Sequence, residues 1–123
     1  MAELGKRELV LALLACRDTP RLAGVDLSGL NLRALCLMGA DLRGANLKSA
    51  DLAHADLRHA RLDHAILVGA SLRFAYLDGA SLENTVLEGC DITQARMEPN
   101  QLNAAQREDA SGSPSERTES GTD

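Results

Sequence analysis

The chain is almost without aromatic residues, because its 123 positions hold one Phe, one Tyr and no Trp. Nucleic-acid-binding proteins usually carry a basic surface, and those that bind single strands stack the bases on aromatic rings. Here the formal net charge is −5 at pH 7. The composition therefore disfavours direct nucleic-acid binding.

Long apolar segments and paired cysteines are also missing. The longest apolar run, LVLALLAC at residues 9–16, is far shorter than the ~20 residues that span a bilayer. The cysteines, Cys16, Cys36 and Cys90, form an odd set without close spacing. This argues against a disulfide framework and favours a reducing compartment such as the cytoplasm.

Two interpretations of residues 1–19 stay open. The favoured one is a capping helix, rich in Leu and Ala over residues 3–16, that covers an end of the following domain. The alternative is a bacterial lipoprotein signal, because a Lys-Arg pair precedes the apolar run and the sequence LLAC resembles a cleavage box. Cys16 would then be lipidated and would anchor the protein to a membrane. Glu3 and Glu8 count against this, since such signals begin with a positively charged region.

What the chain does have is a period of five residues, typified by ADLRG, ANLKS, ADLAH and ADLRH in residues 40–59. Leucine occupies every fifth position from Leu22 to Leu87, and Ile92 and Met97 extend the series to sixteen pentads. On a helix, successive leucines would rotate by roughly 140° and spread over all faces; on a strand they would alternate between faces. The chain must therefore turn once per pentad and coil.

Each pentad predicts which side chains point inward. The central leucine and the residue two before it share one side of an extended segment, so both point in, and the residues flanking the leucine point out. The inward residue before the leucine is Ala in ten of sixteen pentads, which predicts a narrow interior. The fifth residue forms a corner, and Gly, which tolerates the positive φ of a tight turn, occupies seven of these corners.

This pattern resembles the pentapeptide-repeat family over about residues 20–98. The resemblance implies an all-β solenoid: a right-handed quadrilateral β-helix of about four coils, with four pentads in each coil and coils ~4.8 Å apart. It also implies a short C-terminal helix at residues 99–107, in addition to the N-terminal capping helix. The remainder, residues 108–123, is rich in Ser, Gly and charge and is expected to be a disordered tail.

In a four-sided coil, residues twenty positions apart lie one above another. Opposite charges then meet, for example at Arg43 and Asp63 and at Arg58 and Asp78, although like charges meet elsewhere. Such exposed pairs contribute only ~0–1 kcal/mol each. They are expected to adjust the register of the coils and not to hold the fold.

Three histidines, His54, His59 and His64, are the most conspicuous candidate for a metal site. Their spacing of five puts them on successive corners, whereas zinc ligands must each lie ~2.0–2.1 Å from one metal ion. Asp and Asn recur before the leucine as part of the repeat, so they carry no indication of acid-base catalysis. We therefore expect no catalytic, cofactor-binding or metal-binding residues, and a protein that is not an enzyme.

Two sets of apolar residues interrupt the polar exterior. The first forms a small spot on one face, because two of its members flank one leucine and the third stacks in the next coil. The second is an exposed aromatic pair located two faces onward. The candidate partner-contact residues are Ile66, Val68 and Val86 with Glu88 beside them, and separately Phe74 and Tyr76.

These observations predict a non-enzymatic interaction or scaffold module with a protein partner of unknown identity, and they allow weak self-association. An alternative comes from the resemblance, because some pentapeptide-repeat proteins mimic DNA and bind gyrase. Residues 61–98 hold six acidic and three basic side chains, but the whole repeat region nets only −2. A ~20 Å length of duplex DNA carries about twelve negative charges, which weighs against mimicry.

Overall fold

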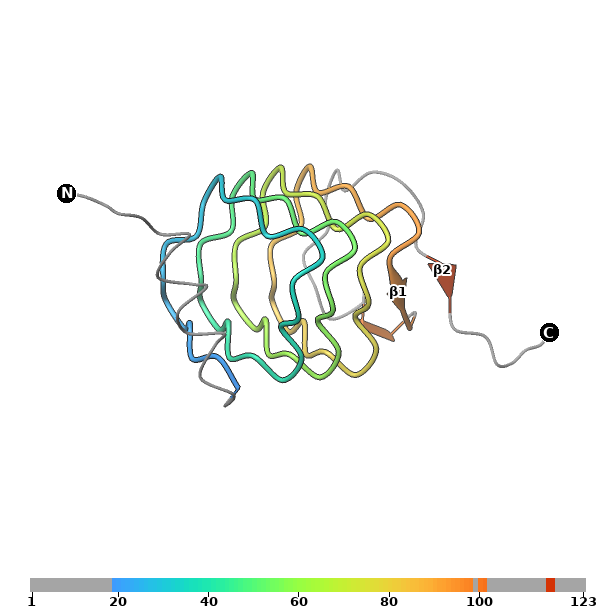
Figure 1. Ribbon diagram of the computed structural model, residues 1–123, viewed down its shortest axis with the longest axis horizontal. Helices are drawn as coiled ribbons and strands as arrows, with labels where there is room; N and C mark the ends of the chain where they lie inside the picture. Colours follow the sequence, from blue (N-terminus) through green and yellow to red (C-terminus); the bar gives the residue numbers. More distant parts are fainter. Residues whose placement is uncertain (1–18, 99, 102–114, 117–123) are drawn as a thin grey trace.

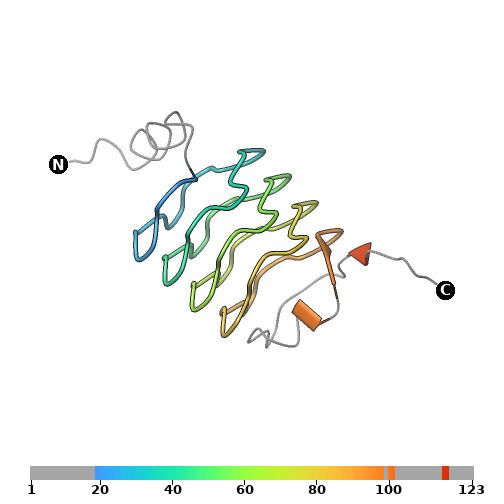
Figure 2. The same ribbon diagram turned by 90° about the horizontal axis from the view of Figure 1, so that it is seen from below.

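The computed structural model describes residues 19–98, 100–101 and 115–116. Over residues 19–98 the chain winds into successive coils that stack along one axis (Figure 1, Figure 2). Parallel bridges join residues twenty positions apart, as in Arg21↔Asp41, Asp41↔Arg61 and Arg61↔Ser81. This spacing confirms four pentads per coil.

The bridges form four ladders, which give the solenoid four flat faces. Each face is identified here by the four inward residues at its centre. Face 1 is centred on Leu22, Leu42, Leu62 and Leu82, face 2 on Leu27, Leu47, Leu67 and Leu87, face 3 on Leu32, Leu52, Leu72 and Ile92, and face 4 on Leu37, Leu57, Leu77 and Met97.

The interior follows the inward assignment. All sixteen centres are buried, with at most 2% of their surface exposed. The alanines two positions before them are buried as well, from Ala40 to Ala80, and Thr85 and Cys90 replace Ala in the last coil without becoming exposed. Val25, Leu30 and Leu35 in the first coil are only partly buried.

The corners require a left-handed backbone at every pentad from residue 24 to residue 94. Seven of these corners are glycines, as the sequence predicts, but eight are other residues with φ between 56° and 64°. A non-glycine residue in this region costs roughly 1–2 kcal/mol. From Gly24 to Phe74, each corner N–H makes a ladder hydrogen bond, such as His59 N–H to the Asp78 carbonyl at 3.0 Å, and these bonds offset the strain.

The recurrence of Asp and Asn before the central leucine has a backbone cause. In the described coils, the N–H of the residue after the centre has no backbone acceptor, whereas the other N–H groups of an interior pentad join a ladder or a turn. The side-chain oxygen of Asp or Asn, two residues earlier, accepts this N–H at 3.0–3.2 Å, which satisfies a donor that the ladder leaves free. The acceptors are Asp26, Asn31, Asp41, Asn46, Asp51, Asp56 and Asp91.

The C-terminal end of the stack is closed by two features. Gln101 is buried, and its Nε2 donates to the carbonyls of Leu77 (2.7 Å) and Ala80 (2.9 Å). In the preceding coils, the carbonyl equivalent to that of Ala80 accepts a backbone N–H from twenty-one residues later, as the Ala60 carbonyl accepts the Ser81 N–H. The Gln101 side chain therefore takes the place that a backbone donor holds in the preceding coils.

The second feature is a two-residue strand pair. Strand β1 (Arg96–Met97) pairs in parallel with β2 (Ser115–Glu116), with Arg96 opposite Ser115 (Figure 1). The two residues of β2 fall within the range 108–123 expected to form a tail, and the rest of that range lies outside the described residues. Strand β1 lies at the edge of the last described coil, where β2 pairs with its backbone groups.

The helical ends are described only in part. Asn100 and Gln101 are helical, within the range 99–107 expected for a C-terminal helix. The rest of that range, and residues 1–18 of the expected capping helix, lie outside the described residues.

Candidate interaction surfaces

The three histidines lie on three successive corners, each with φ of 63–64°. Among the described residues, no group of three or more His, Cys, Asp or Glu side chains could hold a metal ion. Two of the histidine rings contact the residue twenty positions later in the chain. His54 stacks on Phe74, with ring centroids 5.1 Å apart and planes 4° apart. The ring of His59 lies against Gly79, where an added Cβ would be 2.5 Å from Nδ1.

The apolar spot lies on face 2. Ile66 and Val86 are bridge partners in adjacent coils, which confirms that they stack. Ile66 is 37% exposed, Val68 and Val86 are partly buried, and Glu88 is exposed. Asn46 is the bridge partner of Ile66 on the other side, so the apolar strip covers two coils and then becomes polar.

The two aromatic residues lie at different places. Phe74 is at the corner between faces 3 and 4 and is 42% exposed, with the Arg73 guanidinium 5.8 Å from its ring centroid. Tyr76 is on face 4 and is 43% exposed, with the Arg96 guanidinium at the same distance. Face 4 is not adjacent to face 2, so the aromatic pair and the Ile66 strip do not form one surface.

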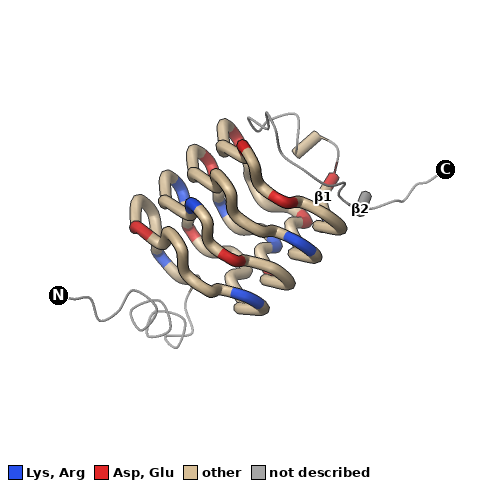
Figure 3. The backbone as a smooth tube through the Cα atoms, turned by 90° about the horizontal axis from the view of Figure 1, so that it is seen from above, with Lys and Arg blue, Asp and Glu red and all other residues tan. Residues whose placement is uncertain are grey.

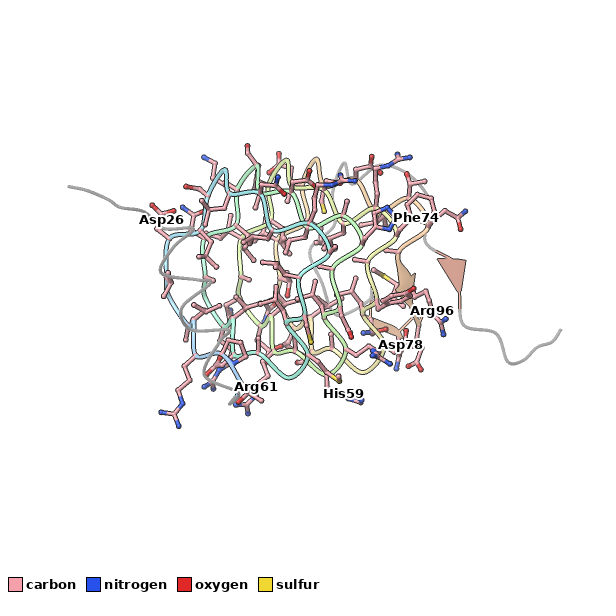
Figure 4. The ribbon with its side chains drawn as sticks, in the orientation of Figure 1. Asp26, His59, Arg61, Phe74, Asp78 and Arg96 are labelled. Atoms are coloured by element: carbon pink, nitrogen blue, oxygen red, sulfur yellow. The ribbon has the colours of Figure 1, made fainter. Side chains whose placement is uncertain are left out.

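Face 4 also carries a cluster of charges around Tyr76. Arg58 holds Asp56 through two bonds, Nε to Oδ1 at 2.9 Å and Nη2 to Oδ2 at 2.8 Å. Between the following two coils, Arg96 Nη2 donates to Asp78 Oδ2 at 3.3 Å, and the two side chains lie together on the outside of the solenoid (Figure 4). Asp78 Oδ1 is buried and has no hydrogen-bond partner in the part of the chain that the structure describes.

An open hollow of about 330 Å³ lies among these side chains. Arg58, Tyr76, Asp78 and Arg96 line it, so it contains two guanidinium groups, a phenol and an incompletely satisfied carboxylate. Apart from Tyr76, these residues are absent from the contact set expected from the sequence. The twenty-residue register places Arg58 beneath Asp78, but the register does not indicate that a hollow forms between them.

The direct ion pairs differ from the vertical pairs expected from the register. Among the described residues they join the two sides of one pentad, as in Asp41–Arg43 at 2.7 Å, or residues eighteen apart in adjacent coils, as in Arg73–Asp91 at 3.2 Å. At Asp41, the side-chain bond to the Arg43 N–H holds the carboxylate over its own pentad, beside the Arg43 guanidinium. The vertical neighbours act at longer range, and Arg61 contributes to lowering the pKa of Asp41.

The pKa values of the paired carboxyls reflect these contacts. The hydrogen bonds from the Arg43 side chain lower the pKa of Asp41 to about 2. Those from Arg58 lower the pKa of Asp56, and the Thr93 hydroxyl does the same for Asp91. These carboxylates therefore stay ionised at neutral pH, so the charge pattern of the faces is fixed there.

Acidic residues outnumber basic ones in the C-terminal coils, with arginines among them (Figure 3). The structure pairs two of these acids with arginines, Asp78 with Arg96 and Asp91 with Arg73. In the described ranges, no helix is long and apolar enough to cross a membrane.

The comparisons with known proteins agree with this geometry. The sequence model described as pentapeptide repeats matches residues 36–73 and 65–98, with 8 copies of the repeat. None of the curated proteins matches the chain.

Several solved structures are similar to the chain, including three pentapeptide-repeat proteins. Rfr23, a pentapeptide-repeat protein of the cyanobacterium Cyanothece 51142, is 32% identical over 76% of this chain and 60% of its own, with a TM-score of 0.62. A pentapeptide-repeat protein of the Arabidopsis thaliana thylakoid lumen is 30% identical over 73% and 59%, with a TM-score of 0.63. One from Nostoc PCC 7120 is 26% identical over 82% and 94%, with a TM-score of 0.63. The chain spans about three fifths of the length of the first two.

Proposed function

Since this chain belongs to the pentapeptide-repeat family, whose members form right-handed quadrilateral β-helices, we propose that it is a non-enzymatic interaction module. It binds a protein partner, as a scaffold does, through the flat outer faces of its solenoid. The observation that carries this proposal is the division of the pentad: the inward residues are mostly buried Leu and Ala, whereas the charged side chains of the repeats occupy outward positions. The odd number of cysteines supports a reducing compartment such as the cytoplasm.

The proposed contact surface for the partner is the Ile66–Val86 strip of face 2 together with Val68, which lies on the other side of the central Leu67. Lys48 and Glu88 form the rim of this surface. A small apolar centre with a polar rim is the usual layout of a contact surface. A stiff β-helix wall loses little conformational freedom on binding. Burying three such side chains supplies only a few kcal/mol, about 1.5–3 each at most, which suits a weak or transient contact.

A pair of matched double variants tests this surface. Ile66→Lys with Val86→Lys adds two positive charges at outward ladder positions of face 2. Ser71→Lys with Ser81→Lys adds the same two charges at equivalent positions of faces 3 and 1. All these side chains point outward, so both variants should melt within a few degrees of the parent.

Quantitative affinity capture from cells of the source organism then compares the two variants with the parent. We expect the face 2 variant to lose proteins that the parent and the Ser71, Ser81 variant both retain. Equal capture by all three proteins would remove face 2 as the contact surface and direct the search to Phe74 and Tyr76.

DNA mimicry is the second candidate, and the observation in its favour is the acidic excess towards the C-terminal coils (Figure 3). The pairing of Asp78 and Asp91 with arginines weakens it, because paired carboxylates present less bare charge to a DNA-binding cleft. We expect no inhibition of gyrase supercoiling at micromolar concentration. Inhibition that disappears when Asp78, Glu83, Glu88 and Glu98 are neutralised would favour mimicry instead.

A further inference from the structure

Face 4 carries two outward columns whose members complement each other coil by coil. The column before the centres is Cys36, Asp56, Tyr76 and Arg96, joined by successive bridges. The column after the centres is Met38, Arg58, Asp78 and Glu98. Within each coil the two members therefore form a thiol and thioether pair, an acid and base pair, a phenol and carboxylate pair, or a base and acid pair.

This order has a symmetry consequence. If a second copy packs its face 4 against the first, with the two solenoid axes parallel and related by a two-fold rotation, each column lies opposite the other column of the partner at the same coil. Asp56 of each copy then faces Arg58 of the other, and Arg96 faces Glu98. Tyr76 faces Asp78, and Cys36 faces Met38. Every opposed pair is complementary.

We propose that face 4 is a self-association surface and that its occupant is a second copy of this chain in the parallel two-fold arrangement. The inference rests on the proposed role of the flat faces as contact surfaces, and it uses a face that does not include the Ile66 strip. Tyr76 and Met38 are two of the exposed large hydrophobic side chains among the described residues, and both lie on face 4. They supply the apolar contribution to the contact, and the charges fix the register.

The hollow beside Tyr76 provides a second reason for a partner at this place. Among the described residues, Asp78 Oδ2 accepts a long bond from Arg96 at 3.3 Å, and the buried Oδ1 has no hydrogen-bond partner. A second copy cannot reach Oδ1, but the Asp78 side chain is 23% exposed, so a further donor can approach Oδ2 and stabilise the carboxylate. In the parallel pair the Tyr76 hydroxyl of the second copy lies across from this carboxylate and donates to Oδ2.

The antiparallel alternative fits less well. Reversing one copy end for end brings Met38 opposite Glu98 and Cys36 opposite Arg96, so both terminal coils lose charge pairing. Face 1 also has alternating charges, at Asp41 and Arg43. Among the described residues, however, it has no exposed large hydrophobic side chain. Face 1 therefore serves as the control surface.

The size of face 4 sets the expected strength. Four coils at ~4.8 Å make a face only about 19 Å tall. The area that such a face can bury is well below the ~800 Å² per partner of a standard interface. The pair is therefore weak, with a dissociation constant on the order of 0.1–1 mM. Chemical cross-linking captures such a pair at concentrations where sedimentation shows mostly monomer.

Cys36 supplies the cross-linking site, because it is exposed whereas Cys90 is buried. In the parallel pair the two Cys36 residues lie at the same coil, ~7 Å apart sideways, whereas in the antiparallel pair they lie about 14 Å apart along the axis alone. A bismaleimide with a two-carbon spacer, applied to the full chain carrying Cys16→Ser, distinguishes the two arrangements, because it joins only thiols that lie close together. We expect a cross-linked dimer whose yield rises with protein concentration.

Two matched arginine reversals test the charge pattern. Arg58→Glu and Arg43→Glu each break an ion pair with the aspartate two residues earlier, and the side chains are similarly exposed, 46% and 48%. Arg58→Glu places two like-charge contacts in the symmetric pair, so the dimer yield should fall by about tenfold or more. Arg43→Glu should leave the yield unchanged. Asp56→Arg combined with Arg58→Glu should restore it, because the two exchanged charges again meet opposite charges across the pair.

Unfolding curves of all variants control for folding. An absent dimer at ~1 mM, a yield unaffected by Arg58→Glu, or an equal loss with Arg43→Glu would each overturn the face 4 pairing. None of these outcomes changes the capture experiment on face 2, so a failure here is distinguishable from a failure of the proposed function.

Discussion

Fourteen of the sixteen inward centres are the same residue, leucine, whereas the outward residues just before them are of eight different types. The centres are all buried, and most of those outward residues are at least partly exposed. An inward position must fill a space of fixed size against the coils above and below it, so volume selects the residue. An outward position has only its direction fixed, so its chemistry is free to vary and to carry recognition.

Neighbouring residues of one coil offer the strongest way to test this comparison. Leu57 is fully buried in a middle coil, and Arg58, the next residue, is exposed. Leu57→Asp buries an unpaired charge and should destabilise the repeat domain by ~4 kcal/mol or more, which is enough to unfold many domains of this size. Arg58→Ala should change the free energy of unfolding by no more than about 0.5 kcal/mol.

Circular dichroism during thermal unfolding measures both variants at a protein concentration too low for self-association. Similar melting temperatures for Leu57→Asp and Arg58→Ala would contradict the inward assignment.

The inward half of the structure and the vertical stacking of the coils could be predicted from the sequence because both depend on the register alone. The period of five and the alanines specify which residues are inside, and the twenty-residue coil places Val86 on Ile66 and Phe74 on His54. The outward half was predicted less well. Direct ion pairs depend on side-chain conformers, and the bond from each aspartate to its own following N–H diverts Asp41 to Arg43.

The two cysteines of the described coils give the second test, because one is on each side of the wall. Cys36 is exposed on face 4, and Cys90 is an inward residue whose burial raises the pKa of its thiol to about 12. In the Cys16→Ser protein, one thiol should react with a disulfide reagent at once. The second should react ~1,000-fold or more slowly, because it requires unfolding that costs several kcal/mol.

Urea above the unfolding midpoint should make both thiols react at similar rates. Two fast thiols in the native protein would contradict the burial of Cys90.

Gln101 has a structural role that the pentad pattern of inward and outward residues does not predict. It satisfies the Leu77 and Ala80 carbonyls of the last coil and also accepts the Glu98 N–H at 2.6 Å. The pentad register continues to Leu102 in the sequence. The register therefore gives no reason to single out Gln101, because its role depends on a side-chain amide that satisfies two carbonyls of the last described coil.

Replacing Gln101 should lower the free energy of unfolding more than replacing its exposed neighbour Asn100. Gln101→Ala removes three hydrogen bonds and should lower the free energy of unfolding by about 1–3 kcal/mol. Gln101→Glu should be worse at neutral pH, because an oxygen would then face two carbonyls. Asn100→Ala, at an exposed position, is the control and should be nearly neutral. Urea midpoints that do not separate Gln101→Ala from Asn100→Ala would remove the closing role of Gln101.

The smallest expected effect on the free energy of unfolding is that of the outward ion pairs, and the pH dependence of stability measures it separately. The Arg43 side chain lowers the pKa of Asp41 from 3.8 to about 2 in the folded protein. A carboxyl with a lowered folded pKa stabilises the fold fully above its unfolded value, near 3.9, and loses this contribution as the pH falls through about 2. Because the pair is partly exposed, the contribution is at most about 1 kcal/mol.

Asp41→Asn separates the charge from the geometry, since an asparagine oxygen can still accept the Arg43 N–H. The parent should be more stable than Asp41→Asn at pH 6, and the difference should shrink between pH 4 and pH 2. High salt should reduce it at pH 6 as well, because exposed charges are screened. A stability difference that stays constant down to pH 2 would mean that the ion pair contributes nothing, and that outward charges on this solenoid act only on whatever binds to its faces.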